Sequence, residues 1–132
     1  MALIRKHFKI KVEGDRVPPP LDNFNKIQEL LKLDVSIMKR IQDQIKFRRP
    51  TAIQMQIIPI IAKKRDVIAL AETGSGKSLS FILPILCKVN PDVEGVQAIV
   101  LAPTRELLLQ LYKQFMVFNP QPKRIKVKFF RK

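Results

Sequence analysis

Two residue types that build cross-links and metal sites are nearly missing from the sequence. Cys87 is the only cysteine and His7 the only histidine among the 132 residues. A disulfide framework or a cysteine-based metal site within the chain is therefore excluded, and a lone histidine is a poor metal ligand. Both scarcities fit a reducing intracellular compartment.

Long apolar runs are also missing. Near the N-terminus only Ala2, Leu3 and Ile4 precede the first charged residue, which is too short for the apolar part of a signal peptide. No run approaches the length needed to cross a bilayer. We therefore expect an intracellular protein that has no membrane partner.

Acidic residues are scarce and unevenly distributed. The chain has 25 lysines and arginines against 11 aspartates and glutamates, a formal net charge of +14. The last acidic residue is Glu106, and seven basic residues follow it. Such an excess favours a polyanionic partner, nucleic acid before a membrane, over a domain that is merely basic and soluble.

What is present is enough for one folded domain, since 46% of the residues are hydrophobic. Residues 1–20 form a basic N-terminal arm that ends in a proline-rich linker, and "HFKIKV" within it fits a short edge strand or an extended arm. Residues 21–132 form the domain. Helices are predicted over 24–32 and 36–45, with Ser36 as a plausible N-cap, and a capping box at 51–54 begins a helix over 51–64.

The second half alternates apolar segments with helical patterns. Segments 66–70 and 97–103 are apolar on both faces, and 124–130 alternates basic and apolar residues, as in a strand with one wet face. Helices are predicted over 77–89 and after Thr104. This order predicts an α/β fold with a parallel sheet and flanking helices, truncated after about three strands. Unpaired strand edges would make the chain marginally stable and prone to associate.

The stretch "AETGSGKS", residues 71–78, has the composition of a phosphate-binding loop. Gly74 and Gly76 can adopt positive φ, which turns backbone amides towards an anion at the start of a helix. Lys77 would reach the β- and γ-phosphates, and the Ser78 hydroxyl would bind Mg²⁺. Ala71 stands where the general pattern has glycine. The alternative is a glycine-rich turn in which Lys77 is simply solvated.

Two further stretches lie at family spacing from this loop. "FRRPTAIQ" places Phe47 seven residues before Gln54, with Phe24 upstream as an isolated aromatic residue, and "PTREL" begins at Pro103. With the loop, they resemble the N-terminal part of the first RecA-like lobe of a DEAD-box ATP-dependent RNA helicase. The segments "VEGDRVPPPLDNF" and "IQMQIIP" are most similar to the Abstrakt-type branch, which is implicated in pre-mRNA splicing.

The resemblance implies ATP and Mg²⁺ as cofactors and RNA as the substrate. It implies that Phe47 stacks on adenine and Gln54 hydrogen-bonds its edge, although Gln54 also fits a plain capping box with no adenine. It implies an RNA-backbone contact by residues of the PTREL motif. It also implies spliceosomal or other ribonucleoprotein partners and a nuclear location. The residues expected at the ATP site are Phe47, Gln54, Ala71, Glu72, Thr73, Gly74, Ser75, Gly76, Lys77 and Ser78, of which Lys77 and Ser78 act in catalysis; those expected to contact RNA are Pro103, Thr104 and Arg105.

Hydrolysis needs carboxylates that the chain does not provide. In this family they come from an Asp-Glu-Ala-Asp motif, but no acidic residue follows Glu106. The second RecA-like lobe is missing too. The chain is therefore expected to be a helicase fragment that is inactive alone. One alternative is an inactive ATP- and RNA-binding module; a less favoured one is a small nucleotide kinase or unrelated ATPase.

The tail "PKRIKVKFFRK" is either family sequence or the product of a frameshift.

Overall fold

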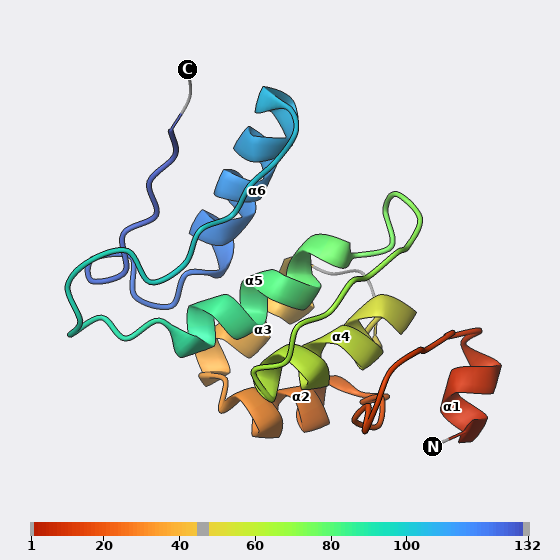
Figure 1. Ribbon diagram of the computed structural model, residues 1–132. Helices are drawn as coiled ribbons and strands as arrows, with labels where there is room; N and C mark the ends of the chain where they lie inside the picture. Colours follow the sequence, from red (N-terminus) through yellow and green to blue (C-terminus); the bar gives the residue numbers. More distant parts are fainter. Residues whose placement is uncertain (1, 45–47, 131–132) are drawn as a thin grey trace.

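The computed structural model describes residues 2–44 and 48–130. Within these residues the chain is helical and forms no β-strand. Figure 1 shows the helices joined by long connections. They are α1 (Ala2–His7), α2 (Phe24–Leu31), α3 (Val35–Gln44), α4 (Ala52–Ala62), α5 (Lys77–Lys88) and α6 (Arg105–Phe118).

Helices α2 to α6 enclose one apolar core. Helix α5 is central to it, since α5 packs against both α4 and α6, while α2 packs on α4 and α3 on α6. Burying each large apolar side chain contributes about 1.5–3 kcal/mol relative to exposure. The buried cluster consists of Phe24, Ile27, Leu33, Ile37, Met38, Ile41, Ile58, Leu79, Ile82, Leu83, Leu86, Phe115 and Phe118.

Helices α4 and α5 run parallel and are joined by a polar contact near each end. At their starts, Gln54 Nε2 donates to the carbonyl oxygen of Gly76 at 3.1 Å. At their ends, Lys88 Nζ donates to the carbonyl oxygen of Ile61 at 2.6 Å. The lysine places a positive charge at the C-terminus of α4, where the helix dipole favours it.

Side-chain caps define where the helices begin. At the start of α2, Asn23 Oδ1 accepts from the Lys26 amide at 2.9 Å. At the start of α6, Thr104 Oγ1 accepts from the Leu107 amide at 3.2 Å. The prediction that Thr104 caps this helix is therefore confirmed. The prediction of Ser36 as an N-cap is wrong: α3 begins one residue earlier, and the carboxylate of Asp34 accepts from the Ser36 amide at 2.7 Å. Hydrogen bonds from Ser36 hold the pKa of the Asp34 carboxyl below its usual value.

The parallel sheet predicted from the sequence is not confirmed. None of the segments 66–70, 97–103 and 124–130 is a strand. In the first two, most of the large apolar side chains face solvent: Ile68 is 93% exposed, Leu70 92% and Leu101 88%, whereas Val100 packs against the core. A strand needs a neighbouring backbone to hydrogen-bond with, and a strand that is apolar on both faces needs cover on both. Neither is supplied to these segments by the rest of the described chain.

The third segment keeps its predicted alternation even without a sheet. Ile125 is buried and Val127 packs against the core, whereas Lys126 and Lys128 are exposed. The ring of Phe129 lies 5.6 Å from that of Tyr112 on α6. Packing against helices therefore separates the two faces of this segment.

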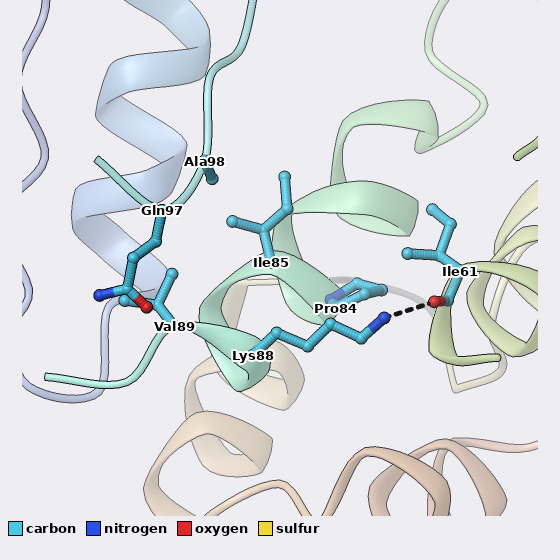
Figure 2. Close-up of a pocket in the computed structure, with 7 residues that line it drawn as sticks. All are labelled: Ile61, Pro84, Ile85, Lys88, Val89, Gln97 and Ala98. Atoms are coloured by element: carbon cyan, nitrogen blue, oxygen red, sulfur yellow. Dashed lines mark hydrogen bonds between the residues drawn. The ribbon is translucent and has the colours of Figure 1, made fainter. Parts of the chain in front are cut away.

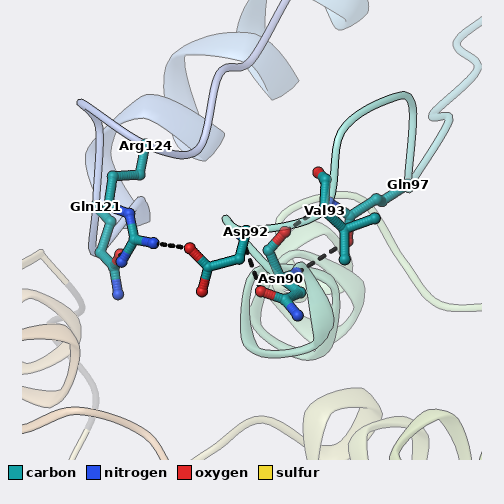
Figure 3. Close-up of polar contacts among 6 residues, drawn as sticks. All are labelled: Asn90, Asp92, Val93, Gln97, Gln121 and Arg124. Atoms are coloured by element: carbon teal, nitrogen blue, oxygen red, sulfur yellow. Dashed lines mark hydrogen bonds and ion pairs between the residues drawn. The ribbon is translucent and has the colours of Figure 1, made fainter.

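The connection between α5 and segment 97–103 is closed by polar contacts. The Gln97 amide group accepts from the backbone N–H of Asn90 at 2.9 Å and donates to the carbonyl oxygens of Asn90 and Val93 at 2.8 and 3.1 Å. Asp92 in the same loop forms an ion pair with Arg124 of the C-terminal segment (Figure 3). The loop thus links the end of α5 to the tail.

The N-terminal segment is helical only at its beginning. Of "HFKIKV", for which the sequence allowed an edge strand or an extended arm, His7 is the last residue of α1, and the remainder is neither helix nor strand. Pro18 and Pro20 are buried, and the Leu21 amide donates to the Met55 carbonyl oxygen of α4 at 2.8 Å. Of the helices described, none has the length and apolar character to span a membrane.

We predict that the exposed apolar segments drive self-association. Replacing Ile68 and Leu70 with serine should shift the chain towards monomer in analytical ultracentrifugation without loss of helical circular dichroism. As a contrast, Ile82→Ala in the fully buried core should cost roughly 2–5 kcal/mol of folding free energy. Association that is unchanged in the double serine variant would contradict this role.

Cys87 should react slowly while the chain is folded. Burial raises the pKa of its thiol from 9.0 to about 11. Because the thiolate is the reactive form, alkylation by iodoacetamide at pH 8 should be about a hundredfold slower than in the denatured chain. Raising the pH towards 11 should speed the reaction of the folded chain, which mass spectrometry can follow. Equal rates for folded and denatured chains at pH 8 would contradict the shift.

Candidate nucleotide-binding site

Residues 71–76 join segment 66–70 to the start of α5, and two glycines shape this loop. Gly74 and Gly76 have φ of 79° and 81°, the left-handed region that favours glycine. A Cβ atom at Gly76 would lie 2.5 Å from Gln54 Nε2 and 3.3 Å from Thr51 Oγ1. At Gly74 a Cβ would meet nothing within 4 Å. A side chain at Gly76 would therefore strain the backbone and displace the Gln54 amide group.

Lys77, the first residue of α5, reaches back over the loop. Its ammonium group donates to the carbonyl oxygen of Ala71 and, at 2.8 Å, to that of Glu72. The Ser75 amide donates to the same Glu72 carbonyl oxygen at 3.3 Å and closes a turn. The alternative in which Lys77 is simply solvated does not match this geometry: Lys77 is held by the loop, and a phosphate bound there would compete with these carbonyl oxygens for the ammonium group.

Two hydroxyl groups near the loop are buried without a hydrogen-bond partner in the described part of the chain. They are Oγ of Ser75, inside the loop, and Oγ1 of Thr51, just before α4. An unsatisfied buried hydroxyl is costly, so such groups indicate a place for a polar ligand or water. Ser78 lies one residue into α5 and is half-buried. The start of α5 therefore combines free helix amides, an ammonium group and hydroxyls, a donor set that fits a magnesium-bound triphosphate.

Gln54 connects α4 to the loop. Its side chain is 2% exposed, its Oε1 accepts from the Thr51 amide at 3.0 Å, and its Nε2 donates to the Gly76 carbonyl oxygen at 3.1 Å. The capping contact predicted for Gln54 is confirmed. The contact with Gly76 was not predicted, because residues 22 apart in sequence are brought together only by the packing of α4 on α5. Phe47, the expected adenine-stacking residue, lies outside the described residues.

The residues predicted to contact RNA lie at the start of α6. Pro103, Thr104 and Arg105 are all exposed, and Thr104 caps the helix. The unpaired amides at a helix N-terminus favour an anion such as a backbone phosphate. In the view of Figure 1, the phosphate loop and this end of α6 both lie at the upper side of the molecule.

Gln56 was missed by the sequence analysis. It is 4% exposed, and its side chain bonds to Arg5 and to the Pro18 carbonyl oxygen. The available signal was a second polar residue within the otherwise apolar run of α4, "AIQMQIIPIIA". A glutamine at such a position needs a buried hydrogen-bond partner.

A separate hollow of about 160 Å³ lies beside the C-terminal half of α5 (Figure 2). None of its lining residues belongs to the phosphate loop, and Lys88 spans it to reach Ile61. Nor does the described chain bring together three histidine, cysteine or acidic side chains as a metal site. The residues lining the hollow are Ile61, Pro84, Ile85, Lys88, Val89, Gln97 and Ala98.

Solved structures share this fold. A TM-score of 0.74 and 33% identity relate the chain to the yeast DEAD-box splicing factor Prp28, over 88% of this chain and 28% of that one. A DEAD box protein from Methanococcus jannaschii is 37% identical with a TM-score of 0.65, over 76% of this chain and 26% of that one. The fold is therefore similar to part of a DEAD-box helicase.

Curated proteins that are similar in sequence are also described as RNA helicases. The chain is 40% identical to the probable ATP-dependent RNA helicase ddx52 of Dictyostelium discoideum, over 90% of this chain and 18% of that protein. It is 39% identical to the pre-mRNA-processing ATP-dependent RNA helicase PRP5 of Candida albicans, over 96% of this chain and 15% of that protein. The chain thus spans less than a fifth of the length of these two relatives.

The family model described as DEAD/DEAH box helicase matches residues 51–131. The match includes α4, the phosphate loop, the PTREL motif and nearly all of the basic tail. The tail therefore falls within family-like sequence, which disfavours a frameshift. By this match and by its relatives, the chain belongs to the DEAD/DEAH box helicase family.

Proposed function

We propose that this chain is the ATP-binding part of an ATP-dependent RNA helicase, which in the complete protein couples ATP hydrolysis to clamping and unwinding of RNA. The observation that carries the proposal is the loop 71–76, with left-handed glycines at 74 and 76 and Lys77 reaching over it from the start of α5. The names of the relatives support it, since ddx52 and PRP5 are described as ATP-dependent RNA helicases.

The proposed ATP site uses residues from α4 and from the loop. Amides of residues 73–78 and the Lys77 ammonium bind the phosphates, and the Ser78 hydroxyl holds Mg²⁺, which neutralises phosphate charge when bound. Gln54 recognises the adenine edge, and Phe47 stacks on the ring. Since Gln54 also donates to the Gly76 carbonyl oxygen, one side chain would contact both the adenine and the loop that binds the phosphates.

We also propose that segments 66–70, 97–103 and 124–130 pair into the parallel sheet of a RecA-like lobe in a longer protein. Their exposed apolar side chains support this, because further strands and helices would cover them. The chain alone lacks the Asp-Glu-Ala-Asp carboxylates, so by itself it is proposed to bind ATP and RNA without turnover. The Abstrakt-type assignment stays a prediction.

RNA, bound through its backbone at Pro103, Thr104 and Arg105, is the proposed substrate. A role in pre-mRNA splicing or other RNA processing, with ribonucleoprotein partners and a nuclear location, is supported by two descriptions: PRP5 is named a pre-mRNA-processing helicase and Prp28 a splicing factor.

We predict that Lys77→Ala weakens binding of a fluorescent ATP analogue by about 10- to 100-fold, because a charge-assisted hydrogen bond to phosphate is lost. Titration by fluorescence anisotropy in the presence of Mg²⁺ measures the dissociation constant. Lys39→Ala, which removes the same charge from the exposed face of α3, is the matched control and should bind normally. Equal affinity of the Lys77 variant and the unaltered chain would contradict the site.

RNA binding should weaken as salt increases, because phosphate contacts release counterions. Arg105→Ala should reduce the slope of log K against log salt by about 0.7 for a single-stranded RNA, the value of one phosphate contact. Lys113→Ala, an exposed lysine further along α6, tests whether position matters as well as charge and should change the slope less. A slope that is the same in the Arg105 variant would remove this residue from the proposed RNA contact.

A further inference from the structure

The N-terminal arm, residues 2–20, is attached to α4 by a closed group of hydrogen bonds. Arg5 Nε donates to Gln56 Oε1 at 2.9 Å, and Arg5 Nη2 donates to the Pro18 carbonyl oxygen at 3.0 Å. Gln56 Nε2 donates to the same carbonyl oxygen at 2.9 Å. Gln56 is 4% exposed, so water could not easily replace these partners. The start of the arm and its proline-rich end therefore meet on one buried glutamine.

A second attachment lies beyond the other end of α4. Arg65 donates through its two terminal nitrogens to the carbonyl oxygens of Asp15 and Arg16, each at 2.7 Å. Arg65 immediately precedes segment 66–70, which leads into the phosphate loop. The Leu21 amide, which directly follows the arm, donates to the Met55 carbonyl oxygen. The arm and its junction are thus attached to the first half of α4 and to Arg65, three residues beyond its end. In Figure 1 the arm runs from α1 back towards α2 and α4.

Helix geometry relates the arm to the nucleotide site. Gln54 and Gln56 are two residues apart on α4, about 200° around the helix axis, so their side chains leave it on nearly opposite sides. Gln54 bonds to Gly76 in the phosphate loop, and Gln56 bonds to the arm. The first turns of α4 are thus held between the loop on one side and the arm on the other.

We propose that the arm is a brace that holds α4 against the phosphate loop, with Arg5 and Gln56 as positioning residues for adenine-selective nucleotide binding. The inference rests on the proposed nucleotide site. Without Arg5, the buried Gln56 amide loses a partner, and α4 must shift or admit water to satisfy it. Any such shift moves Gln54, which sits in the same helical turn. Loss of the contact between the arm and α4 should therefore weaken the binding of ATP more than the binding of a nucleotide with another base.

The test compares two adjacent basic residues of the arm. Arg5→Ala removes the contact with Gln56, whereas Lys6→Ala removes the same charge from an exposed side chain. Dissociation constants are measured for fluorescent ATP and GTP analogues with the full 132-residue chain, and circular dichroism monitors folding. Arg5→Ala should weaken ATP binding about three- to tenfold while changing GTP binding less. Lys6→Ala should match the unaltered chain.

Other outcomes overturn the brace. Unchanged ATP affinity in Arg5→Ala would do so, and so would an equal loss for ATP and GTP with a lower melting temperature, which indicates stabilisation alone. If Arg5→Ala does not fold, Arg65→Lys provides the test. This variant keeps the charge but loses the forked donation to the carbonyl oxygens of Asp15 and Arg16. An unchanged ratio of ATP affinity to GTP affinity in Arg65→Lys would refute the proposal. Failure of the unaltered chain to bind ATP would instead refute the nucleotide site, and the brace with it.

Discussion

The hydrogen bond between Gln54 and the Gly76 carbonyl oxygen is the contact on which the candidate site depends. Apolar packing holds α4 against α5, but such packing tolerates small changes more readily than a directional bond does. Gln54 fixes the start of α4 at the residue where the phosphate loop becomes a helix. A Cβ atom at Gly76 would approach Gln54 Nε2 to 2.5 Å, so the close contact itself requires glycine there.

Several of the 25 basic side chains form hydrogen bonds within the fold, so part of the excess positive charge stabilises the structure. Arg40 donates to the carbonyl oxygens of Val117 and Asn119, at 3.2 and 2.7 Å, where α6 ends. Two ion pairs join described residues, Lys26 with Asp22 and Arg124 with Asp92. With few carboxylates available, backbone carbonyl oxygens become the main internal acceptors. The basic side chains that donate to them are Arg5, Arg40, Arg65, Lys77 and Lys88.

The helices and the extended segments differ in what they need from the rest of a protein. A helix satisfies its own backbone hydrogen bonds and needs only one apolar face covered, which α2 to α6 provide for one another. A strand needs a second strand for its backbone and, when apolar on both faces, layers on both sides. Ile68 and Leu70 therefore stay exposed while Ile82 and Leu83 are fully buried, although all four belong to comparably apolar stretches.

Local patterns in the sequence determined most of the helices, the loop and its glycines, because capping residues, apolar periodicity and left-handed glycine act within a few residues of one another. The Thr104 cap and the capping contact of Gln54 are examples. Only the tertiary structure decided that Gln54 meets Gly76, that Arg5 meets Gln56 and that Lys77 bonds to its own loop, since these contacts depend on how helices pack. The predicted sheet is not confirmed in the described residues for the same reason: pairing between distant segments depends on neighbours that no local pattern supplies.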